Sequence, residues 1–313
     1  ILILGSLWAL VTLGFLILLL MLDISRHREN LQLESSVVYE YAYERALINE
    51  VLLNNFVELV ENDLDDRLAI RRYARDMREH YPHISHFLLY QRVSSEQVDA
   101  FELAQTDKGS LRYHLRTLDE GMEEQPPLQL QQPFYYPAVF VEPQTPATET
   151  LLGLDGYSHP ANRVAMMQAS YYLDVFASEA YPLLSGEMGY RLFHAIDPAL
   201  AGEDEEGHLI ASIVLRADEL LPPLPHIKKG LKLSLIDGKG ALLVLRPSKR
   251  EASWFSRKLL PMIEDTRNIS RFGQSLEIVV EKQLIWSEIN WLIGFVVMVF
   301  SIVAFVLTLQ NYL

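Results

Sequence analysis

Residues 153–170, GLDGYSHPANRVAMMQAS, are the part of this sequence best suited to hold a ligand. Asp155 ends a short apolar run, and Ser158 and Pro160 follow at positions where a helix is capped and begins. An ionised aspartate only accepts hydrogen bonds, so a buried one needs donors, and a ligand with N–H groups can supply them. Such a charged hydrogen bond contributes about 1.5–3 kcal/mol. The simpler alternative is that Asp155 caps the turn or pairs with Arg163.

Two other groups of residues could in principle bind a metal ion or a phosphate. His80, His83 and His86 stand three apart, but Pro82 interrupts the helix that would align them, and no acidic or Cys ligand has zinc-like spacing. We therefore interpret them as polar surface histidines at the boundary of an element. Residues 237–240, DGKG, lack the spacing of a phosphate loop and predict a hairpin turn.

No set of residues predicts catalysis. The acidic run at residues 59–67 is interpreted as a solvated helix face, because it lacks the loop residues that fold around calcium. The chain has no cysteine, no serine elbow and no paired carboxylates in a cleft-like context. We expect this chain to have no enzymatic activity, no cofactor and no metal.

The two ends of the chain are apolar and predict two transmembrane helices. Residues 1–22 carry no charge and no proline. A helix of this length is long enough to cross a bilayer. A second uncharged run, residues 289–309, follows Trp286 and includes Trp291, as an interfacial aromatic belt would. Two anchors around one large loop place both termini on the same side of the membrane.

All charged residues lie in the loop between the anchors, so the formal net charge of −14 belongs to it. An acidic domain repels phosphate backbones, and nucleic acid is not expected as a partner. The chain begins at Ile1 and ends soon after the second anchor. We expect a fragment, with an output activity encoded after Leu313.

The loop begins with a long helical segment. Residues 23–81 contain no Gly or Pro, which predicts an uninterrupted helix with one apolar stripe. The stripe could pack on the rest of the domain or on the same helix of a second subunit. Apolar runs bounded by turn residues then predict strands at residues 86–93, 190–196, 209–215, 231–245 (a hairpin) and 275–280, with an edge strand within 133–146 and an acidic loop at 201–207.

Seven ordered motifs resemble the CHASE domain, the extracytoplasmic sensor of many bacterial receptors and of plant cytokinin-receptor histidine kinases. They are Tyr81-Pro82, Val93, Phe101-Glu102, Val141-Glu142-Pro143, Gly153-Leu154-Asp155, Ser158-x-Pro160 and Arg163. The resemblance covers about residues 73–221 well and continues beyond as the order of anchor, stalk, domain and anchor.

The resemblance implies an α+β fold with a long N-terminal stalk helix, two PAS-like α/β subdomains and two flanking transmembrane helices. The boundaries are 1–22 and 285–313 for the transmembrane helices, 23–81 for the stalk, 82–221 for the membrane-distal subdomain and 222–284 for the membrane-proximal one. It also implies a ligand anchored by Asp155 with a backbone contact near Ala177. The expected ligand-binding residues are Asp155, Ala177, Leu154, Tyr157, Arg163 and Phe176. The family often has a Gly where the helix after the arginine ends, whereas this chain has Tyr171, Tyr172 and Leu173 there. Large aromatic side chains near the pocket would change its shape, which makes an adenine-like ligand doubtful and leaves the ligand class open.

The function implied is a ligand-sensing module of a transmembrane receptor. It would be a homodimer through the stalk, crossing a bacterial inner membrane twice with residues 23–285 in the periplasm. The missing cytoplasmic output would be a histidine kinase or a cyclic-di-GMP enzyme. The alternative is a periplasmic protein-interaction or dimerisation platform without a small-molecule ligand, which a pocket sealed by Tyr171 and Tyr172 would favour.

Overall fold

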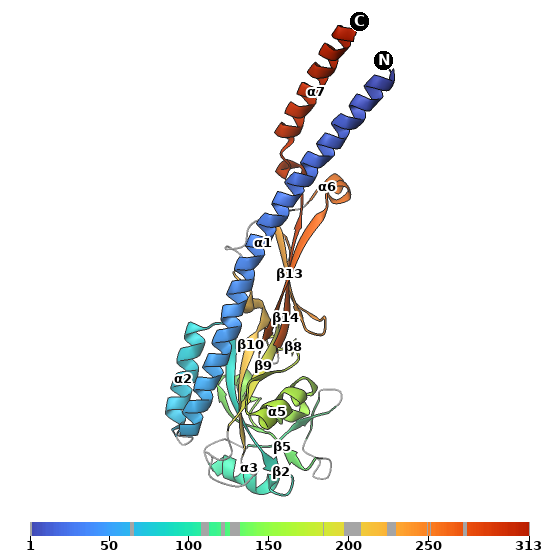
Figure 1. The fold of residues 1–313 in the computed structure, drawn as a ribbon. Helices are drawn as coiled ribbons and strands as arrows, with labels where there is room; N and C mark the ends of the chain where they lie inside the picture. Colours follow the sequence, from blue (N-terminus) through green and yellow to red (C-terminus); the bar gives the residue numbers. More distant parts are fainter. Residues whose placement is uncertain are drawn as a thin grey trace.

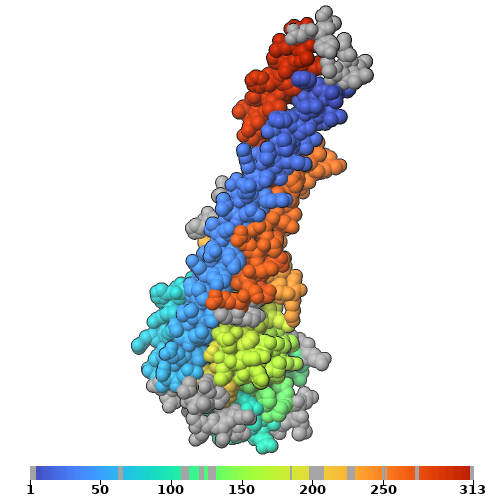
Figure 2. All heavy atoms as spheres, in the orientation of Figure 1, coloured from blue at the N-terminus to red at the C-terminus, as the bar shows by residue number. Residues whose placement is uncertain are grey.

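The structure is a computed structural model, an elongated molecule with two sheets stacked along one very long helix (Figure 1). Figure 2 shows the same outline in space-filling form. The structure describes residues 2–62, 66–107, 113–119, 123–125, 132–183, 185–196, 208–223, 230–248, 250, 252–271 and 274–312. The predicted acidic loop at 201–207 and part of the acidic run at 59–67 lie outside these residues.

The predicted first anchor and residues 23–62 of the predicted stalk form one helix, α1 (Leu2–Asn62). The prediction of an uninterrupted helix over residues 23–81 is wrong, because a second helix, α2 (Arg67–His80), folds back beside the end of α1 (Figure 1). Asp66 starts it, with its carboxylate accepting from the Ala69 amide at 2.9 Å. A good N-cap residue can begin a new helix in a stretch that has no Gly or Pro.

The membrane-distal sheet is antiparallel and has the order β6-β1-β10-β9-β7, with β8 also paired to β9. Three predicted strands are confirmed in its centre: β1 (Ile84–Gln91), β9 (Met188–Ala195) and β10 (Leu209–Arg216). The remaining strands are β6 (Ala138–Glu142), β7 (Phe176–Ala177) and β8 (Tyr181–Pro182). Smaller elements surround the sheet: β2 (Val93–Ser94), α3 (Val98–Asp107), β3 (Thr117–Leu118), β4 (Glu124–Gln125), β5 (Phe134–Tyr135), α4 (Pro146–Glu149), the 3-10 turn η1 (Gly156–Ser158) and α5 (Pro160–Tyr172).

The membrane-proximal sheet has the antiparallel order β12-β11-β14-β13. The predicted hairpin is confirmed as β11 (Leu231–Asp237) and β12 (Leu242–Arg246), and the predicted last strand as β14 (Gln274–Gln283). The edge strand β13 (Met262–Arg271) and the short helix α6 (Trp254–Leu259) were not predicted. A 3-10 turn, η2 (Ala217–Leu220), precedes the predicted boundary at Pro222 and Pro223.

Both faces of the distal sheet are buried, which explains its nearly continuous apolar strands. Because side chains alternate across a strand, Phe87 of β1 packs in the core under α1 and α2 while Leu88 packs in the core under α5. The core under α1 continues into the proximal sheet, where it includes Leu233 and Ile278. Helix α1 therefore packs on both subdomains.

The two apolar ends lie side by side at the same end of the molecule (Figure 1). Helix α1 and the last helix, α7 (Trp291–Tyr312), contain windows of mean hydropathy 2.5 and 2.9 and are long enough to cross a membrane. A hydrogen bond of 2.9 Å from the Trp8 indole to the Ser301 hydroxyl joins them. Where the pair meets the domain, Asp23 accepts from the Asn290 amide at 3.0 Å.

Candidate functional site

Two backbone bridges hold the Asp155 segment in place. Leu154 forms a parallel bridge to Arg116, and Asp155 forms an antiparallel one to Pro137. The Asp155 amide donates to the Arg116 carbonyl at 2.8 Å, and the Gly156 amide donates to the Tyr136 carbonyl at 2.9 Å. The short apolar run that Asp155 ends is thus a two-residue bridge segment, followed by the η1 turn.

Gly153 is required by its surroundings. Its φ is +81°, and a Cβ at this position would lie 2.1 Å from the carbonyl oxygen of His114. Both the left-handed conformation and the close approach of another backbone segment exclude larger residues. The glycine of the Gly-Leu-Asp motif therefore serves to bring the chain close to His114.

The Asp155 carboxylate is fully buried, and within the described ranges only one of its two oxygens has a partner. Oδ1 accepts from the backbone amides of Tyr136 at 2.8 Å and Tyr157 at 3.1 Å. Oδ2 is buried and has no hydrogen-bond partner in the part of the chain that the structure describes. Burial raises the pKa of Asp155 to about 6, although the two backbone amides act in the opposite direction.

The start of α5 differs from the prediction that Ser158 caps it. His159 is the N-cap, and its Nδ1 accepts from the Ala161 amide at 3.2 Å. Ser158 belongs to η1, where its hydroxyl donates to the Asp155 carbonyl at 2.6 Å. The first turn of α5 also carries the buried Asn162, which donates to the Gly156 carbonyl at 3.2 Å while its Oδ1 is buried without a partner. A second unsatisfied acceptor therefore belongs to a residue bonded to the Asp155–Gly156 turn.

A buried cation close to this turn was not predicted. Arg191 of β9 is only 8% exposed, and its Nη1 donates to the hydroxyl of Tyr90. The ring of Tyr90 lies against Gly156, where a Cβ would be 2.7 Å from Cε1. The guanidinium carbon of Arg191 also lies 5.6 Å from the centre of the Tyr181 ring. The sequence indicated this buried cation only by the presence of an arginine within the apolar strand segment YRLFHAI.

Four other predicted site residues lie around the same distal core. Leu154, Tyr157 and Phe176 are partly buried against it. Arg163 is exposed on α5; its Nε donates to the Tyr157 carbonyl at 3.4 Å, and its guanidinium lies 5.7 Å from the centre of the Tyr157 ring. The positive charge of Arg163 partly offsets the rise in the pKa of Asp155 that burial causes. The structure thus brings these four residues and Asp155 to one side of the distal sheet.

Ala177 lies elsewhere. It lines a cavity of about 370 Å³ between α5 and the β11–β12 turn of the proximal subdomain, and Asp155 is not part of that lining. The ion pair between Lys239 and Glu179 links the two subdomains beside this cavity. Asp155 and Ala177, the two ligand contacts that the family resemblance implies, are therefore on different surfaces of the distal subdomain.

Tyr171 and Tyr172 do not seal a pocket. Their side chains are 79% and 62% exposed at the end of α5. The helix ends at Tyr172, and its C-cap residue Leu173 adopts the left-handed conformation with φ of 50°. Tyr172 nevertheless lies next to a predicted site residue, with its ring centre 5.7 Å from that of Phe176, so the effect of these rings on a ligand stays a prediction.

The prediction that His80, His83 and His86 all lie at the surface is wrong for two of them. His83 and His86 are buried, 0% and 4% exposed, whereas only His80 is exposed. His83 bonds to Arg45 and Asn49 on α1. Within the described part of the chain, no three His, Cys, Asp or Glu side chains are grouped as they would be around a metal ion.

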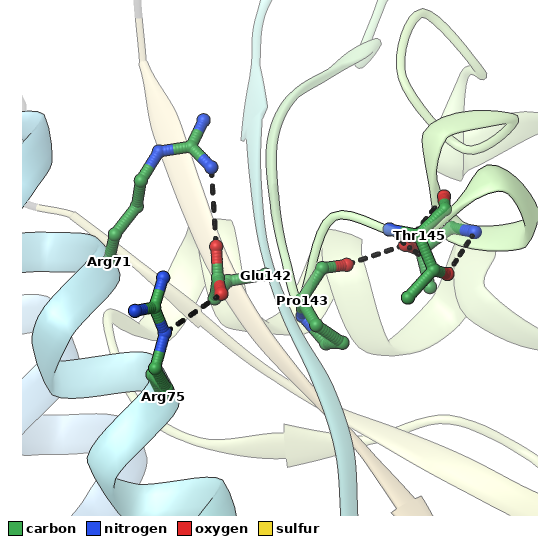
Figure 3. Close-up of polar contacts among 6 residues, drawn as sticks. Arg71, Arg75, Glu142, Pro143 and Thr145 are labelled. Atoms are coloured by element: carbon green, nitrogen blue, oxygen red, sulfur yellow. Dashed lines mark hydrogen bonds and ion pairs between the residues drawn. The ribbon is translucent and has the colours of Figure 1, made fainter.

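The Glu-Pro motif joins α2 to the distal sheet (Figure 3). The Glu142 carboxylate, whose side chain is 5% exposed, lies 3.2 Å from Nη1 of Arg71 and 3.8 Å from Nε of Arg75. On the other side of the strand, the Thr148 hydroxyl donates to the Pro143 carbonyl. This motif therefore positions the helix that folds back along α1.

The two antiparallel sheets and the long helix α1 thus form an α+β domain between two helices that are long and apolar enough to cross a membrane. The CHASE domain model matches residues 65–243, more than half of the chain, and the chain belongs to the CHASE domain family. It is thus an extracytoplasmic sensing module of the kind found in receptors, with the architecture of a membrane-bound receptor that has an extracellular domain. The curated proteins contain no match.

Two solved structures are similar to this chain. One is the extracellular ligand binding receptor from Desulfohalobium retbaense, with 10% identity and a TM-score of 0.45 over 78% of this chain. This chain spans only 39% of that receptor's length. The other is the periplasmic sensory domain of the Campylobacter jejuni chemoreceptor Tlp1, with 11% identity, a TM-score of 0.45, and coverage of 80% of this chain and 94% of that one.

Proposed function

We propose that this chain binds a small molecule at Asp155 and transmits the binding through α1 and α7 to a cytoplasmic output domain. The observation that carries the proposal is the buried Oδ2 of Asp155, which has no hydrogen-bond partner among the residues that the structure describes. A buried acceptor left unsatisfied costs about 1–3 kcal/mol, so a ligand N–H placed there gains binding free energy. The unsatisfied Oδ1 of Asn162 supports the same ligand chemistry, a molecule with more than one N–H donor.

Transmission would depend on α1, because this helix packs on both sheets and also forms the first membrane anchor. A ligand shifts two signalling states only by its differential affinity for them, typically by about 1–3 kcal/mol. The output domain would be a histidine kinase or a cyclic-di-GMP synthase or hydrolase. The sensing loop would lie in the periplasm, with α1 and α7 crossing the inner membrane.

We also propose that the receptor is a homodimer through the stalk. Leu33, Val37 and Val51 of α1 are 68%, 69% and 48% exposed, so one side of the helix keeps apolar residues that a second copy could bury. Val37 and Val51 are two heptads apart, as residues in a helix–helix seam are, with the exposed Glu44 at the heptad position between them.

The test of the ligand site uses the full chain in lipid nanodiscs. Native mass spectrometry would look for a co-purified ligand, and thermal unfolding would be followed against a panel of small molecules that includes adenine derivatives. The informative variant is Asp155→Asn, which keeps the Oδ1 acceptor for the Tyr136 and Tyr157 amides but replaces Oδ2 with an NH₂ group. Asp155→Ala would remove both backbone contacts and confound the result.

The expected outcome is a ligand-dependent rise in melting temperature that disappears in Asp155→Asn. Asp174→Asn is the matched control, because it removes the same charge at an exposed position of the same subdomain. A ligand effect that is unchanged in Asp155→Asn would exclude Asp155 as the anchor.

A second candidate function is a protein-interaction platform. Helix α5 exposes Val164, Met167, Tyr171 and Tyr172, which are 53%, 55%, 79% and 62% exposed and fall on one helical face. If no small molecule binds and the double variant Met167→Ser/Tyr171→Ser abolishes receptor output, the platform is the better description.

A further inference from the structure

Four large apolar side chains are exposed together at the membrane end of the proximal subdomain. Trp254, Phe255 and Leu259 of α6 are 59%, 62% and 62% exposed, and Met262 at the start of β13 is 53% exposed. We call these four residues the α6 patch. Contiguous exposed apolar residues, aromatic ones above all, are typical of a surface that contacts a partner or a membrane.

The position of the α6 patch relative to the bilayer is set by β14. Met262 is the register partner of Gln283. The side-chain Nε2 of Gln283 donates to the Leu260 carbonyl at 3.1 Å. Gln283 is the last residue of β14, after which only a short 3-10 turn precedes the transmembrane helix α7 at Trp291. In Figures 1 and 2, α6 accordingly projects sideways close to the level at which α7 begins.

The residues around this level have the chemistry of a membrane interface. Trp286 and Trp291 stack at 4.9 Å at the base of α7, where an aromatic belt is expected. Two exposed cations, Arg257 and Lys258, accompany the α6 patch, and Nζ of Lys258 lies 5.0 Å from the centre of the Trp254 ring. Aromatic and aliphatic residues next to basic ones are the composition of interfacial helices that bind anionic lipids.

We propose that the α6 patch inserts into the headgroup region of the bilayer leaflet that faces the sensing domain. The two basic residues would contact anionic headgroups, which is notable in a chain with a net charge of −14. The proximal sheet then has a third attachment to the membrane besides α1 and α7. This attachment restricts tilting of the sheet, and it is independent of whether Asp155 binds a ligand.

The experiment uses the full chain in nanodiscs of phosphatidylcholine and phosphatidylglycerol, with and without bromine on the acyl chains. Bromine quenches only tryptophans that reach the lipid. The chain has four tryptophans, so the signal of Trp254 is taken as the difference between the wild type and Trp254→Phe. Brominated lipid should remove most of this difference signal, while aqueous acrylamide should quench it weakly.

The control places a tryptophan on an exposed position far from the membrane. Tyr171→Trp in the Trp254→Phe background should be quenched by acrylamide and not by brominated lipid, because Tyr171 is 79% exposed on the distal subdomain. In Arg257→Ser/Lys258→Ser, quenching of Trp254 by brominated lipid should decrease and lose its dependence on phosphatidylglycerol.

Two results would overturn the proposal. If Trp254 is quenched by acrylamide and not by brominated lipid, the patch faces water. If neither agent quenches it and cross-linking joins two copies through α6, the patch is an interface between protein chains.

Discussion

Arg45 of the stalk helix donates from Nη1 to Nδ1 of His83 at 2.7 Å, and Nε2 of His83 lies 2.6 Å from the Asn49 side-chain oxygen. A guanidinium can only donate, so Nδ1 must accept and Nε2 must carry the proton. The ring is therefore neutral in the folded protein. Burial, with Arg45 and Arg216 nearby, lowers the pKa of His83 to about 3.

The first prediction is that His83 makes the domain sensitive to mild acid. Its pKa is lower in the folded state than the usual 6.5, so the unfolded chain binds the proton more tightly and stability falls as pH drops below 6.5. Between pH 7 and pH 5 the loss from this residue should be about 2 kcal/mol. In His83→Gln the amide can keep both hydrogen bonds without titrating.

Chemical unfolding of the wild type and His83→Gln at the two pH values measures this difference. The buried His86, whose pKa is also lowered to about 3, is present in both proteins and cancels. Equal losses in the two proteins would show that His83 does not set the acid sensitivity.

The second prediction concerns Asp155 and has the opposite sign. Its pKa is raised from 3.8 to about 6, so the folded state binds the proton more tightly and its stability falls as pH rises from about 4 through 6. Asp155→Asn does not titrate and should gain about 2 kcal/mol relative to the wild type between pH 4 and pH 7. Urea unfolding of the ligand-free proteins across this range tests it, and a constant difference would contradict the raised pKa.

The third prediction separates backbone strain from steric clash. Gly153→Ala should destabilise the domain by about 3 kcal/mol or more, since it combines a left-handed alanine with a Cβ against the His114 carbonyl. Gly186 has a similar φ of +83° but nothing within 4 Å of the added Cβ. Gly186→Ala should therefore cost only about 1 kcal/mol. Similar melting temperatures for the two variants would exclude the clash.

The fourth prediction compares the buried carboxylate of the Glu-Pro motif, Glu142, with the more exposed of its two arginine partners, Arg75. Glu142→Ala should destabilise the distal subdomain by about 2–4 kcal/mol, because it leaves the partly buried Arg71 without its carboxylate. Arg75→Ala should change stability by less than about 0.5 kcal/mol, since its side chain is 62% exposed and 3.8 Å from Glu142. Hydrogen exchange of α2 amides should increase only in the first variant, and an equal increase in both would contradict this assignment.

The sequence was sufficient for features that depend on short-range patterns. The two apolar terminal helices, the central strands and the hairpin at residues 237–240 each follow from hydrophobicity or turn residues within one short window. The ordered motifs were also sufficient to recognise the family. The strand β13 was missed because it is an edge strand whose residues are mostly polar and of which only two, Ile263 and Ile269, are buried.

The tertiary structure alone decided which residues meet. Tyr90 and Arg191 are 101 positions apart, and their contact depends on the register of β1 and β9 on either side of β10. The same holds for His83, which the sequence placed at the surface and the fold buries against α1. Local sequence determines the conformation of a segment, whereas burial and hydrogen-bond partners depend on how distant segments pack. The identity of Asp155 as a candidate was therefore visible in the sequence, but its buried, half-satisfied carboxylate was a consequence of the fold.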